Sequence, residues 1–433
     1  MLYVFEVMEE KSLFKCTDKC PAYGWCHTIR ETVAKNYAKA VEMFKETEKP
    51  QFFKKIREKR VRFSYPAMKP VNMLNRDISV AALQAFQKNN NKKLAVCEPL
   101  SGCGVRGIRY AKEVRGIEKV VVNDWSPLAF SLIRENVKIN NVEDKVSAYN
   151  EEASSLMCKL SAQGIRFDVI DIDPYGSPVP FLDAAFKVLR AKNGFLCITA
   201  TDTATLCGVY PETCYRKYHS KPLRTEYNHE LAVRILTGYV AMEAARYDIG
   251  VKPVFSYFNE HHLRIFLETN QGARQANESI RKLGYILHCF NCNHREVLKE
   301  IVGFLSHTCN VCGSDKIDLG GPLWIVKIVE KDFSKKILSI LEGTNFYTKK
   351  YALKFVGTIL KEADAPIFYH NIHKVCKEAK VQVPPKTILI DELEKRGFKV
   401  HETHFSPYGI KTDASRKDLF EIVRQLQVGR YTV

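Results

Sequence analysis

The sequence of 433 residues lacks the features that would anchor it in a membrane or direct it to export. It contains no apolar run of about 18 residues, the length that a membrane-spanning helix requires. Its first residues lack the basic, apolar and small-residue regions of a secretory signal peptide. We therefore expect a protein that has no membrane partner and is not secreted, in the nucleus or alternatively the cytoplasm.

Disulfide bonds are not expected either, although the chain contains 14 cysteines. In a reducing compartment cysteines remain thiols or bind metal, and most of the isolated ones are expected to be small core residues. Two C-x-x-C pairs differ, because their separation is typical of a four-thiolate zinc ribbon. These ligand candidates are Cys289, Cys292, Cys309 and Cys312.

Four thiolates close the coordination sphere of zinc, so we predict a structural Zn²⁺ ion without a catalytic role. The alternative is a pair of reduced dithiols, with His288, His294 and His307 near enough in sequence to replace a missing thiolate. A second cluster has suitable ligand types at looser spacing, and metal binding there stays open: Cys16, Cys20, Cys26 and His27.

Acidic residues are fewer than basic ones, which gives a net charge of +17. Such a charge favours a polyanionic partner, most commonly nucleic acid, over a merely soluble basic protein. Between Lys49 and Lys69 the only acidic residue is Glu58, and aromatic residues alternate with the basic ones. We expect a phosphate-binding surface here, with a solvated helix face or a nuclear-import signal as alternatives. The candidate RNA-binding residues are Lys54, Lys55, Arg57, Lys59 and Arg60.

From Leu94 onward apolar strands alternate with helical stretches, which predicts an α/β fold with a parallel, doubly wound sheet. The expected strands are Leu94–Cys97, Lys119–Asn123, Lys145–Tyr149, Val169–Asp173 and Phe195–Ala200. Two later strands, Val254–Phe258 and Leu263–Glu268, are expected to be antiparallel. Near the end of the chain, helix, turn, helix and a β-ribbon at Phe398–Thr412 resemble a winged helix.

These elements predict three regions. Residues 1–62 form a basic N-terminal extension, residues 63–270 an α/β domain, and residues 271–433 an α+β C-terminal domain. The zinc ribbon is expected near residues 286–326 of the last region.

A glycine-rich loop, Gly102-x-Gly104-x-x-Gly107, follows the first strand of the sheet, and Asp124 ends the next strand. Glycines let the backbone approach a ligand closely, and such an acid can accept both ribose hydroxyls. NAD and S-adenosylmethionine sites share this geometry. Glu98 would repel a pyrophosphate but can hold an ammonium, and Glu152 can accept from an adenine amine. We therefore favour S-adenosylmethionine over NAD, with mere strand–helix packing as the third interpretation.

The strand Val169–Asp173 continues into Pro174 and Tyr175 at the edge of the sheet where α/β folds bind ligands. A carboxylate to accept an amine proton, a fixed carbonyl and a ring for stacking suit chemistry on an exocyclic nucleobase amine. We predict that Asp173, Pro174 and Tyr175 carry the catalysis.

A long series of motifs appears in one order along the chain. It includes Asn75-Arg76-Asp77, the stretch Leu100–Ala111, Asp171–Pro178, Thr199–Asp202 and His404–Thr412. Over roughly residues 70–425 the sequence closely resembles the tRNA (guanine-26 N2)-dimethyltransferase family. The resemblance implies a Rossmann-like class I methyltransferase domain, a C-terminal domain that engages tRNA, and methylation of a tRNA guanine amine, twice.

By match to the family motifs, Arg76, Glu98, Asp124, Glu152 and Ala153 are expected to bind the cofactor, with Gly102 and Gly104 in the loop beside it. Asp173, Pro174 and Tyr175 are expected to form the guanine pocket. Lys411, in the C-terminal ribbon, is expected to contact tRNA if the ribbon is a tRNA-facing wing.

The sequence departs from the family pattern in two places. Ala67-Met68-Lys69-Pro70 stands where the family usually carries Phe-Tyr-Asn-Pro, and Tyr175 stands where many members have Phe. Both departures resemble the diverged animal paralogue of the family, and they leave the target open between guanosine 26 and a neighbour. Two alternatives remain: a catalytically silent tRNA-binding protein of this fold, which the retained Asp173 disfavours, and a nicotinamide oxidoreductase.

Overall fold

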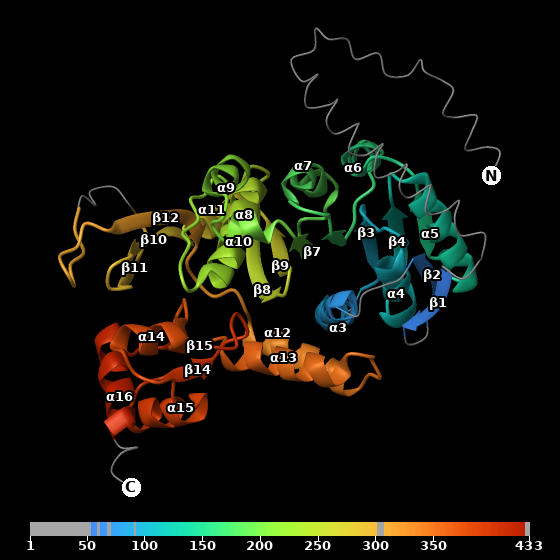
Figure 1. Cartoon of the computed structure of the whole chain (residues 1–433). Helices are drawn as coiled ribbons and strands as arrows, with labels where there is room; N and C mark the ends of the chain where they lie inside the picture. The colour runs from blue at the N-terminus through green and yellow to red at the C-terminus, as the bar shows by residue number, and fades with distance from the viewer. Residues whose placement is uncertain (1–52, 59–60, 67–70, 91, 301–306, 429–433) are drawn as a thin grey trace, which may run out of the picture. The chain divides into compact units, whose positions relative to one another are not determined.

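The computed structural model describes residues 53–58, 61–66, 71–90, 92–300 and 307–428 (Figure 1). The chain divides into two compact units, residues 1–54 and 55–433. The candidate metal cluster from Cys16 to His27, together with Lys59 and Arg60, lies outside the described residues. No helix in the described ranges is long and apolar enough to cross a membrane. The three regions expected from the sequence stay a prediction.

The basic stretch before the sheet forms strands where it is described. β1 (Phe53–Glu58) and β2 (Val61–Pro66) pair as a two-stranded sheet. Lys54, Lys55 and Arg57 therefore lie on a strand, and the alternative of a helix face is wrong for these residues. Their contact with RNA stays a prediction.

A seven-stranded sheet forms the centre of the second unit, with the strand order β5-β4-β3-β6-β7-β9-β8. Its strands are β3 (Leu94–Glu98), β4 (Ile117–Asn123), β5 (Val146–Tyr149), β6 (Val169–Ile172), β7 (Gly194–Ala200), β8 (Ile249–Asn259) and β9 (His262–Gln271). The first five pair in parallel, and β9 runs antiparallel to both β7 and β8. This order confirms the predicted doubly wound sheet with an antiparallel pair at one edge.

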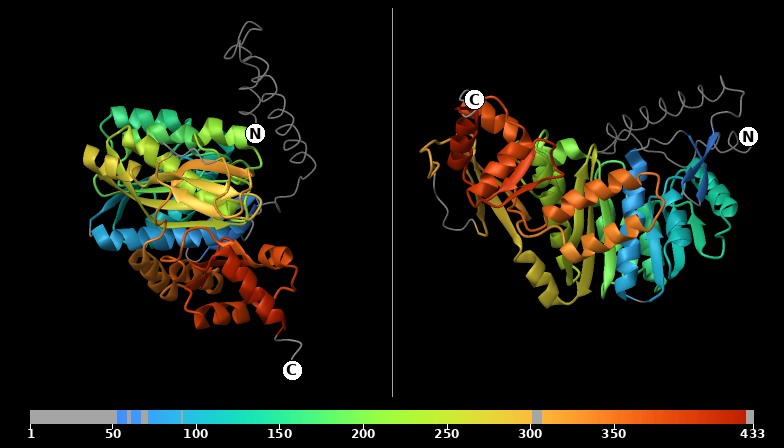
Figure 2. Two further views of the ribbon diagram at one scale, coloured as in Figure 1. Left: turned by 90° about the vertical axis from the view of Figure 1, so that its left-hand side faces the viewer. Right: turned by 90° about the horizontal axis from the view of Figure 1, so that it is seen from below.

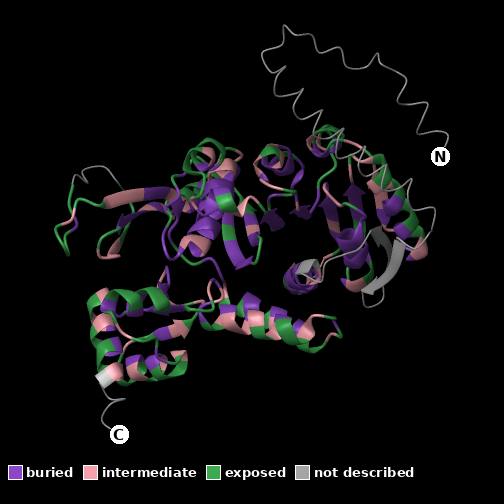
Figure 3. Cartoon of the chain, in the orientation of Figure 1, coloured by how far each residue is buried: buried purple, intermediate pink, exposed green. Residues whose placement is uncertain are grey.

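Helices lie on both faces of this sheet, as Figure 2 shows. α4 (Val105–Glu113) contacts α3 (Val71–Asn90) and α5 (Pro127–Ile139), while α7 (Val179–Val188) contacts α6 (Ala153–Ala162) and α10 (Asn228–Ala245). Every residue of β6 and β7 is buried, in keeping with the continuous apolar runs of strands covered on both faces (Figure 3).

The order of the strands determines where a ligand can bind. β3 has β4 on one side and β6 on the other, so the strands that follow β3 first extend the sheet on one side of it and, from β6 onward, on the other side. In doubly wound sheets the crevice outside the carboxyl ends of the strands at such a point is the binding site. Glu98 ends β3, Asp124 follows β4 and Asp173 follows β6, so all three acids lie at this edge. After β7 come two short helices, α8 (Thr203–Leu206) and α9 (Pro211–Tyr218).

The C-terminal part contains two further sheets. After α11 (Ala273–Ile280), the first has the order β11-β10-β12, formed by β10 (Leu283–Cys289), β11 (Arg295–Leu298) and β12 (Ile317–Trp324). α12 (Lys331–Glu342) and α13 (Lys349–Lys361) follow. The chain ends with β13 (His370–Asn371), α14 (Ile372–Ala379), α15 (Lys386–Lys395), β14 (Val400–Glu402), β15 (Gly409–Thr412) and α16 (Arg416–Val428).

This last segment has its own small hydrophobic core, which includes Ile372, Leu389 and Leu419. After α13 the chain forms strand β13, helices α14 and α15, and a ribbon of β14 and β15. The strand order in the small sheet is β13-β15-β14. That succession confirms the winged-helix-like end expected from the sequence.

Lys411 is a correction to the sequence-based prediction. Its side chain is only 5% exposed, and its Nζ lies 3.1 Å from Glu230 Oε2 and 3.3 Å from Glu362 Oε2. The ribbon turns this ammonium inward, where it neutralises two buried carboxylates, one on α10 and one at the end of α13. The prediction that Lys411 contacts a tRNA phosphate is therefore wrong.

The same cluster affects the ionisation of Glu362, which also accepts hydrogen bonds from Thr403 Oγ1 at 2.6 Å and from the backbone N–H of His404 at 3.0 Å. Burial alone would raise the pKa of Glu362, but His404 and Lys411 outweigh it and hold the value down to about 2. The carboxylate is therefore charged in the folded protein at neutral pH.

Replacing Lys411 should destabilise the fold. The Lys411→Ala variant leaves Glu230 and Glu362 without their shared cation, and breaking a buried pair in this way costs about 3–5 kcal/mol. Urea unfolding would measure this difference against Lys395→Ala, which removes an exposed lysine from α15 and should change stability by less than about 0.5 kcal/mol.

The pH dependence follows from the direction of the shift. Because the pKa of Glu362 is depressed on folding, its contribution is complete above its ordinary pKa of 4.5 and is lost as the pH falls towards 2. The difference between wild type and Lys411→Ala should shrink over that interval. Equal stabilities at pH 7 would contradict the structural role of Lys411.

Candidate active site at the carboxyl edge of the sheet

The glycine-rich loop joins β3 to α4, and its three glycines meet two requirements. Gly102 and Gly104 have φ angles of +57° and +77°, a region that residues with a Cβ rarely adopt. A Cβ on Gly102 would meet nothing within 4 Å, so this side of the loop faces open space. A Cβ on Gly107 would lie 2.4 Å from Val122, so the third glycine allows close packing of helix and strand.

Asp124 connects this loop to the end of β4. Its Oδ2 accepts a hydrogen bond from the Gly102 N–H at 3.0 Å, and its Oδ1 accepts one from the Ser126 N–H at 2.9 Å. A carboxylate oxygen can accept more than one hydrogen bond. The half-buried Asp124 is thus fixed in place and still able to bind two hydroxyl groups.

Glu98 is almost fully buried at the end of β3. Its Oε2 accepts the Gly107 N–H at 2.8 Å, and its Oε1 lies 4.0 Å from Arg106 Nε. Burial raises the pKa of Glu98 to about 8, although Arg106 opposes the shift. A second cation placed here, such as a ligand ammonium, would lower the pKa of Glu98 and favour the charged carboxylate.

The remaining cofactor candidates have mixed environments. Arg76, buried in the first part of α3, lies close enough to the glycine loop for its charge to oppose the burial-raised pKa of the Cys103 thiol. Glu152 is exposed and caps α6, accepting the N–H groups of Ser154 at 2.9 Å and Ser155 at 2.7 Å. Ala153 is buried at the start of that helix. Glu152 therefore has a capping role that the sequence reasoning missed, and its contact with adenine stays a prediction.

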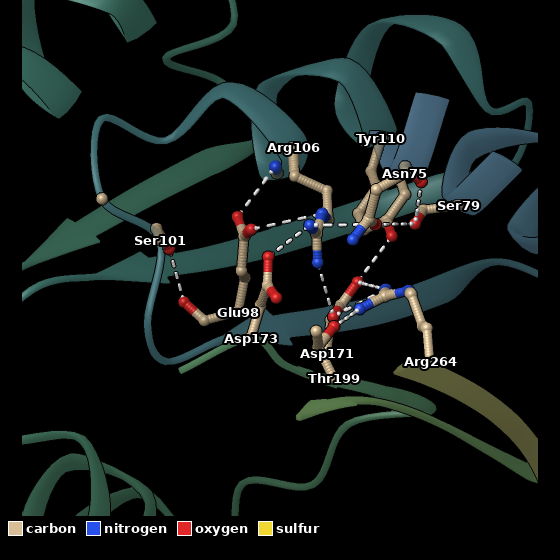
Figure 4. A network of polar contacts seen from close by, with 12 residues as sticks. Asn75, Ser79, Glu98, Ser101, Arg106, Tyr110, Asp171, Asp173, Thr199 and Arg264 are labelled. Carbon is tan, nitrogen blue, oxygen red and sulfur yellow. Dashed lines mark hydrogen bonds and ion pairs between the residues drawn. The ribbon is translucent and has the colours of Figure 1, made fainter. Parts of the chain in front are cut away.

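Asp171 is the fully buried centre of the polar network drawn in Figure 4. Arg264 Nη2 donates to both of its oxygens, at 2.9 and 2.7 Å, and Arg106 Nη1 donates to Oδ1 at 3.0 Å. The Tyr110 hydroxyl donates to Oδ2 at 2.6 Å. Arg106 and Tyr110 lie on α4, and Arg264 lies on β9, so Asp171 on β6 holds these two elements together.

Asp173 depends on the same two arginines. Arg106 Nη2 binds Asp173 Oδ2 directly and also lies 3.3 Å from Asn75 Oδ1 on α3. Burial would raise the pKa of Asp173, but Arg106 and Arg264 hold it down to about 2. The side chain is 27% exposed. The structure therefore presents an ionised, oriented and accessible carboxylate beside the glycine loop.

The two residues after Asp173 have opposite environments. Pro174 is buried, whereas the Tyr175 ring is 99% exposed. The turn that carries the ring is fixed to the end of β7, because the Gly176 N–H donates to Thr201 Oγ1 at 2.6 Å and the Thr201 N–H donates to the Gly176 carbonyl at 2.9 Å. An exposed ring on a fixed turn is available for stacking, and a base as its partner stays a prediction.

Sequence reasoning missed the contribution of β9. Since this strand is antiparallel to β7, with Leu263 opposite Ala200, its first residues lie at the same edge as the ends of the parallel strands. His262 and Arg264 therefore reach the site from a strand start, whereas the motifs searched for lie at strand ends. The only signal in the sequence was the predicted antiparallel pairing itself.

Among the buried polar atoms near Asp173 that have no hydrogen-bond partner in the described residues are the Tyr257 hydroxyl and His262 Nε2, besides the Nε atoms of Arg106 and Arg264. The two rings make an edge-on contact at 5.8 Å. Burial lowers the pKa of His262 to about 4, so its imidazole is neutral at neutral pH. Buried polar atoms are rarely left unpaired, so the Tyr257 hydroxyl and His262 Nε2 are candidates to bind a ligand beside Asp173.

Comparison with known proteins supplies the family. The family model for N2,N2-dimethylguanosine tRNA methyltransferases matches residues 44–424. The chain belongs to this family. The finding confirms the resemblance inferred from the ordered motifs, and it favours S-adenosylmethionine over NAD as the cofactor type.

Relatives of the methyltransferase family cover most of the chain. The tRNA (guanine(26)-N(2))-dimethyltransferase of Methanobrevibacter smithii is 40% identical over 353 residues, 82% of this chain and 89% of its own length. The one from Methanothermobacter thermautotrophicus is 41% identical over 376 residues, 86% of this chain and 95% of its own. The solved complex of Trm1 from Pyrococcus horikoshii with S-adenosyl-L-methionine has a TM-score of 0.75 and 32% identity, covering 85% of this chain and 99% of that one.

This family member also brings its four predicted metal ligands together. The Sγ atoms of Cys289 and Cys312 are 3.7 Å apart, as are those of Cys292 and Cys309, and all four lie within 4.8 Å of one another. Tetrahedral zinc with Zn–S bonds of about 2.3 Å requires sulfur atoms roughly 3.8 Å apart. The four thiolates therefore fit a closed zinc site. They lie more than 100 positions after Asp173 in the sequence, which agrees with a structural role.

Elemental analysis should find about one zinc ion per chain. Cys289→Ser should release the ion and lower the unfolding temperature, because it removes one of four ligands. Cys158→Ser, at an exposed cysteine outside the cluster, should retain both the metal and the stability. A metal-free wild-type protein with full stability would refute the zinc ribbon.

Proposed function

We propose that this protein transfers methyl groups from S-adenosylmethionine to the exocyclic N2 of a tRNA guanosine, at position 26 or a neighbour. The product is N2,N2-dimethylguanosine. The observation that carries the proposal is the ionised Asp173 carboxylate, held by Arg106 beside a glycine loop that faces open space. Membership of the methyltransferase family supports the reaction class.

The residues at the carboxyl edge suit the cofactor. Asp124 would accept the ribose hydroxyls, Gly102 and Gly104 would let the backbone approach, and Glu98 would face the ammonium of the methionine moiety. Arg76 would face its carboxylate, and the start of α6 at Glu152 and Ala153 would lie by the adenine. S-adenosylmethionine supplies an electrophilic methyl group on a sulfonium sulfur.

The guanine amine is a poor nucleophile, because its lone pair is delocalised into the ring. Asp173 and the Pro174 carbonyl would accept hydrogen bonds from the two N–H groups of the amine. These hydrogen bonds would favour the pyramidal amine, whose lone pair can attack the methyl group. As the new N–C bond forms and the bond between the methyl group and sulfur breaks, the amine nitrogen becomes cationic. Its N–H protons, two in the first cycle and one in the second, then become strongly acidic. A carboxylate with a pKa of about 2 can take one of them, so we place proton transfer after most of the methyl transfer.

The target base must leave its stack to reach Asp173, which costs a few kcal/mol. Stacking on the exposed Tyr175 would offset part of this cost. The neutral His262 imidazole and the Tyr257 hydroxyl would supply hydrogen-bonding groups for other atoms of the base. After the first methylation one N–H remains, so the second cycle needs only one acceptor at the amine.

Asp173→Asn tests the catalytic assignment. The amide keeps the size of the side chain but removes the charge that accepts the proton, so methylation should fall at least about a hundredfold. Incubation with unmodified tRNA and methyl donor, followed by nucleoside mass spectrometry, measures the yield of mono- and dimethylguanosine. Asp144→Asn, at an exposed acid outside the site, should retain full activity. Near-normal turnover of Asp173→Asn would remove Asp173 from the mechanism.

Asp124→Asn tests the cofactor assignment. The amide cannot accept the two backbone N–H groups and two hydroxyls that the carboxylate can accept, so the affinity for S-adenosylmethionine should fall about 10- to 100-fold. Calorimetry compares it with Asp144→Asn, whose affinity should match wild type. Unchanged affinity would show that Asp124 does not hold the ribose.

A further inference from the structure

α13 connects the catalytic edge to the C-terminal segment, and both of its ends are fixed. At its start, Thr348 donates to Asp77 Oδ2 through its hydroxyl at 2.5 Å and its backbone N–H at 3.3 Å. Asp77 also accepts from Arg109 at 2.8 Å and immediately follows Arg76 in α3. At its end, Glu362 binds Thr403, His404 and Lys411 of the C-terminal segment.

The inner and outer faces of α13 differ in chemistry. Its inner face buries Ala352, Val356 and Ile359. Its outer positions, spaced three, four or seven residues apart, are exposed, as Figure 3 shows along the helix. The exposed residues of this face are Lys350, Tyr351, Lys354 and Lys361, and Tyr347 is exposed just before the helix. We call these five residues the basic face of α13.

The charges of this basic face are not neutralised by any acidic residue in the described part of the chain. No acidic residue occurs between Lys349 and Lys361, and Lys350, Lys354 and Lys361 make no ion pair with any described residue. The neighbouring helix α12 is different, because Lys331 pairs with Asp364 and Lys335 lies 3.4 Å from Asp332. An uncompensated row of lysines between two fixed ends indicates a polyanionic partner.

The aromatic residues of the basic face narrow the choice of partner. Tyr347 is 78% exposed, and the Tyr351 ring, 53% exposed, stacks against Phe355 at 6.1 Å with an interplanar angle of 11°. Lysines that bind phosphates beside rings that contact bases or sugars are typical of surfaces that follow a nucleic-acid strand. From Lys350 to Lys361 the face extends about 16 Å along the helix axis, which is enough for several phosphates.

We propose that the basic face of α13 holds the tRNA strand that leads away from the target guanosine towards the C-terminal segment. A tRNA that places a base at Asp173 and also reaches the winged-helix-like end passes this helix, since α13 is fixed to both. The inference rests on the proposed function for the identity of the RNA. It assigns the tRNA contact that was predicted for the buried Lys411 to an exposed surface in the same part of the chain.

The test removes three charges at once, in Lys350→Ala/Lys354→Ala/Lys361→Ala. All three lysines are exposed, so the variant should fold, as its unfolding temperature can verify. Its affinity for tRNA should fall at least tenfold at physiological salt. The slope of log K against log salt should become shallower by up to about 0.7–0.9 for each lost phosphate contact. The KM for tRNA should rise while kcat at saturating tRNA and the affinity for S-adenosylmethionine stay unchanged.

The matched control removes three exposed lysines at the amino ends of the sheet strands, away from the catalytic edge: Lys93→Ala/Lys119→Ala/Lys192→Ala. It changes the net charge equally and should leave tRNA binding near wild type. Tyr347→Ala should raise KM without changing the salt slope, because it removes a ring and no charge.

Three outcomes would overturn the inference: unchanged binding by the α13 variant, equal losses in both triple variants, or binding of polyglutamate as tight as that of tRNA. Binding is measured without turnover, so the result stands apart from the proposed reaction. If wild type methylates no tRNA but the two triples still differ in tRNA affinity, the methyltransferase proposal fails and the RNA surface remains.

Discussion

The buried pairing of Asp171 with two arginines determines the geometry of the catalytic edge. Arg264 and Arg106 both bind this carboxylate, and Arg106 extends from it to Asp173. Both arginines are buried, and removing Asp171 would leave their charges without the carboxylate that they share, which is costly in the interior. The accessible Asp173 carboxylate is therefore oriented, through Arg106, by the fully buried Asp171, so its position is fixed by the protein itself.

The sequence predicted the parts of the fold that have strong local patterns. The parallel strands, the zinc ligands and the winged-helix order each have a periodicity or a spacing that survives without tertiary information. α3 was missed because it is buried on nearly all sides from Leu74 to Phe86, so it lacks the apolar stripe by which helices are recognised. The helix that carries Arg76 was therefore known only through its motif.

Where the sequence-based predictions of the site residues failed, the reason was different. Whether a lysine binds a phosphate or a buried glutamate depends on its tertiary neighbours, and Lys411 looks the same in the sequence in either case. The sequence could not predict that Arg106 and Arg264 bind the same carboxylate, because they are 158 positions apart and only the sheet order brings them together. Motifs report which residues lie at strand ends, but not which charges pair across strands.

Because β9 runs antiparallel to β7, the residues proposed to bind the cofactor and those proposed to bind the target base come from different parts of the sheet. The groups proposed to bind the cofactor lie at the ends of β3, β4 and β5, whereas the tight turn between β8 and β9 brings His262 towards Asp173, where we propose that the base binds. The turn tip at Glu260 and His261 is exposed, so residues inserted there would change the surroundings of His262 without disturbing the glycine loop. Within such a fold, the choice of nucleotide can diverge in evolution while the methyl donor stays constant.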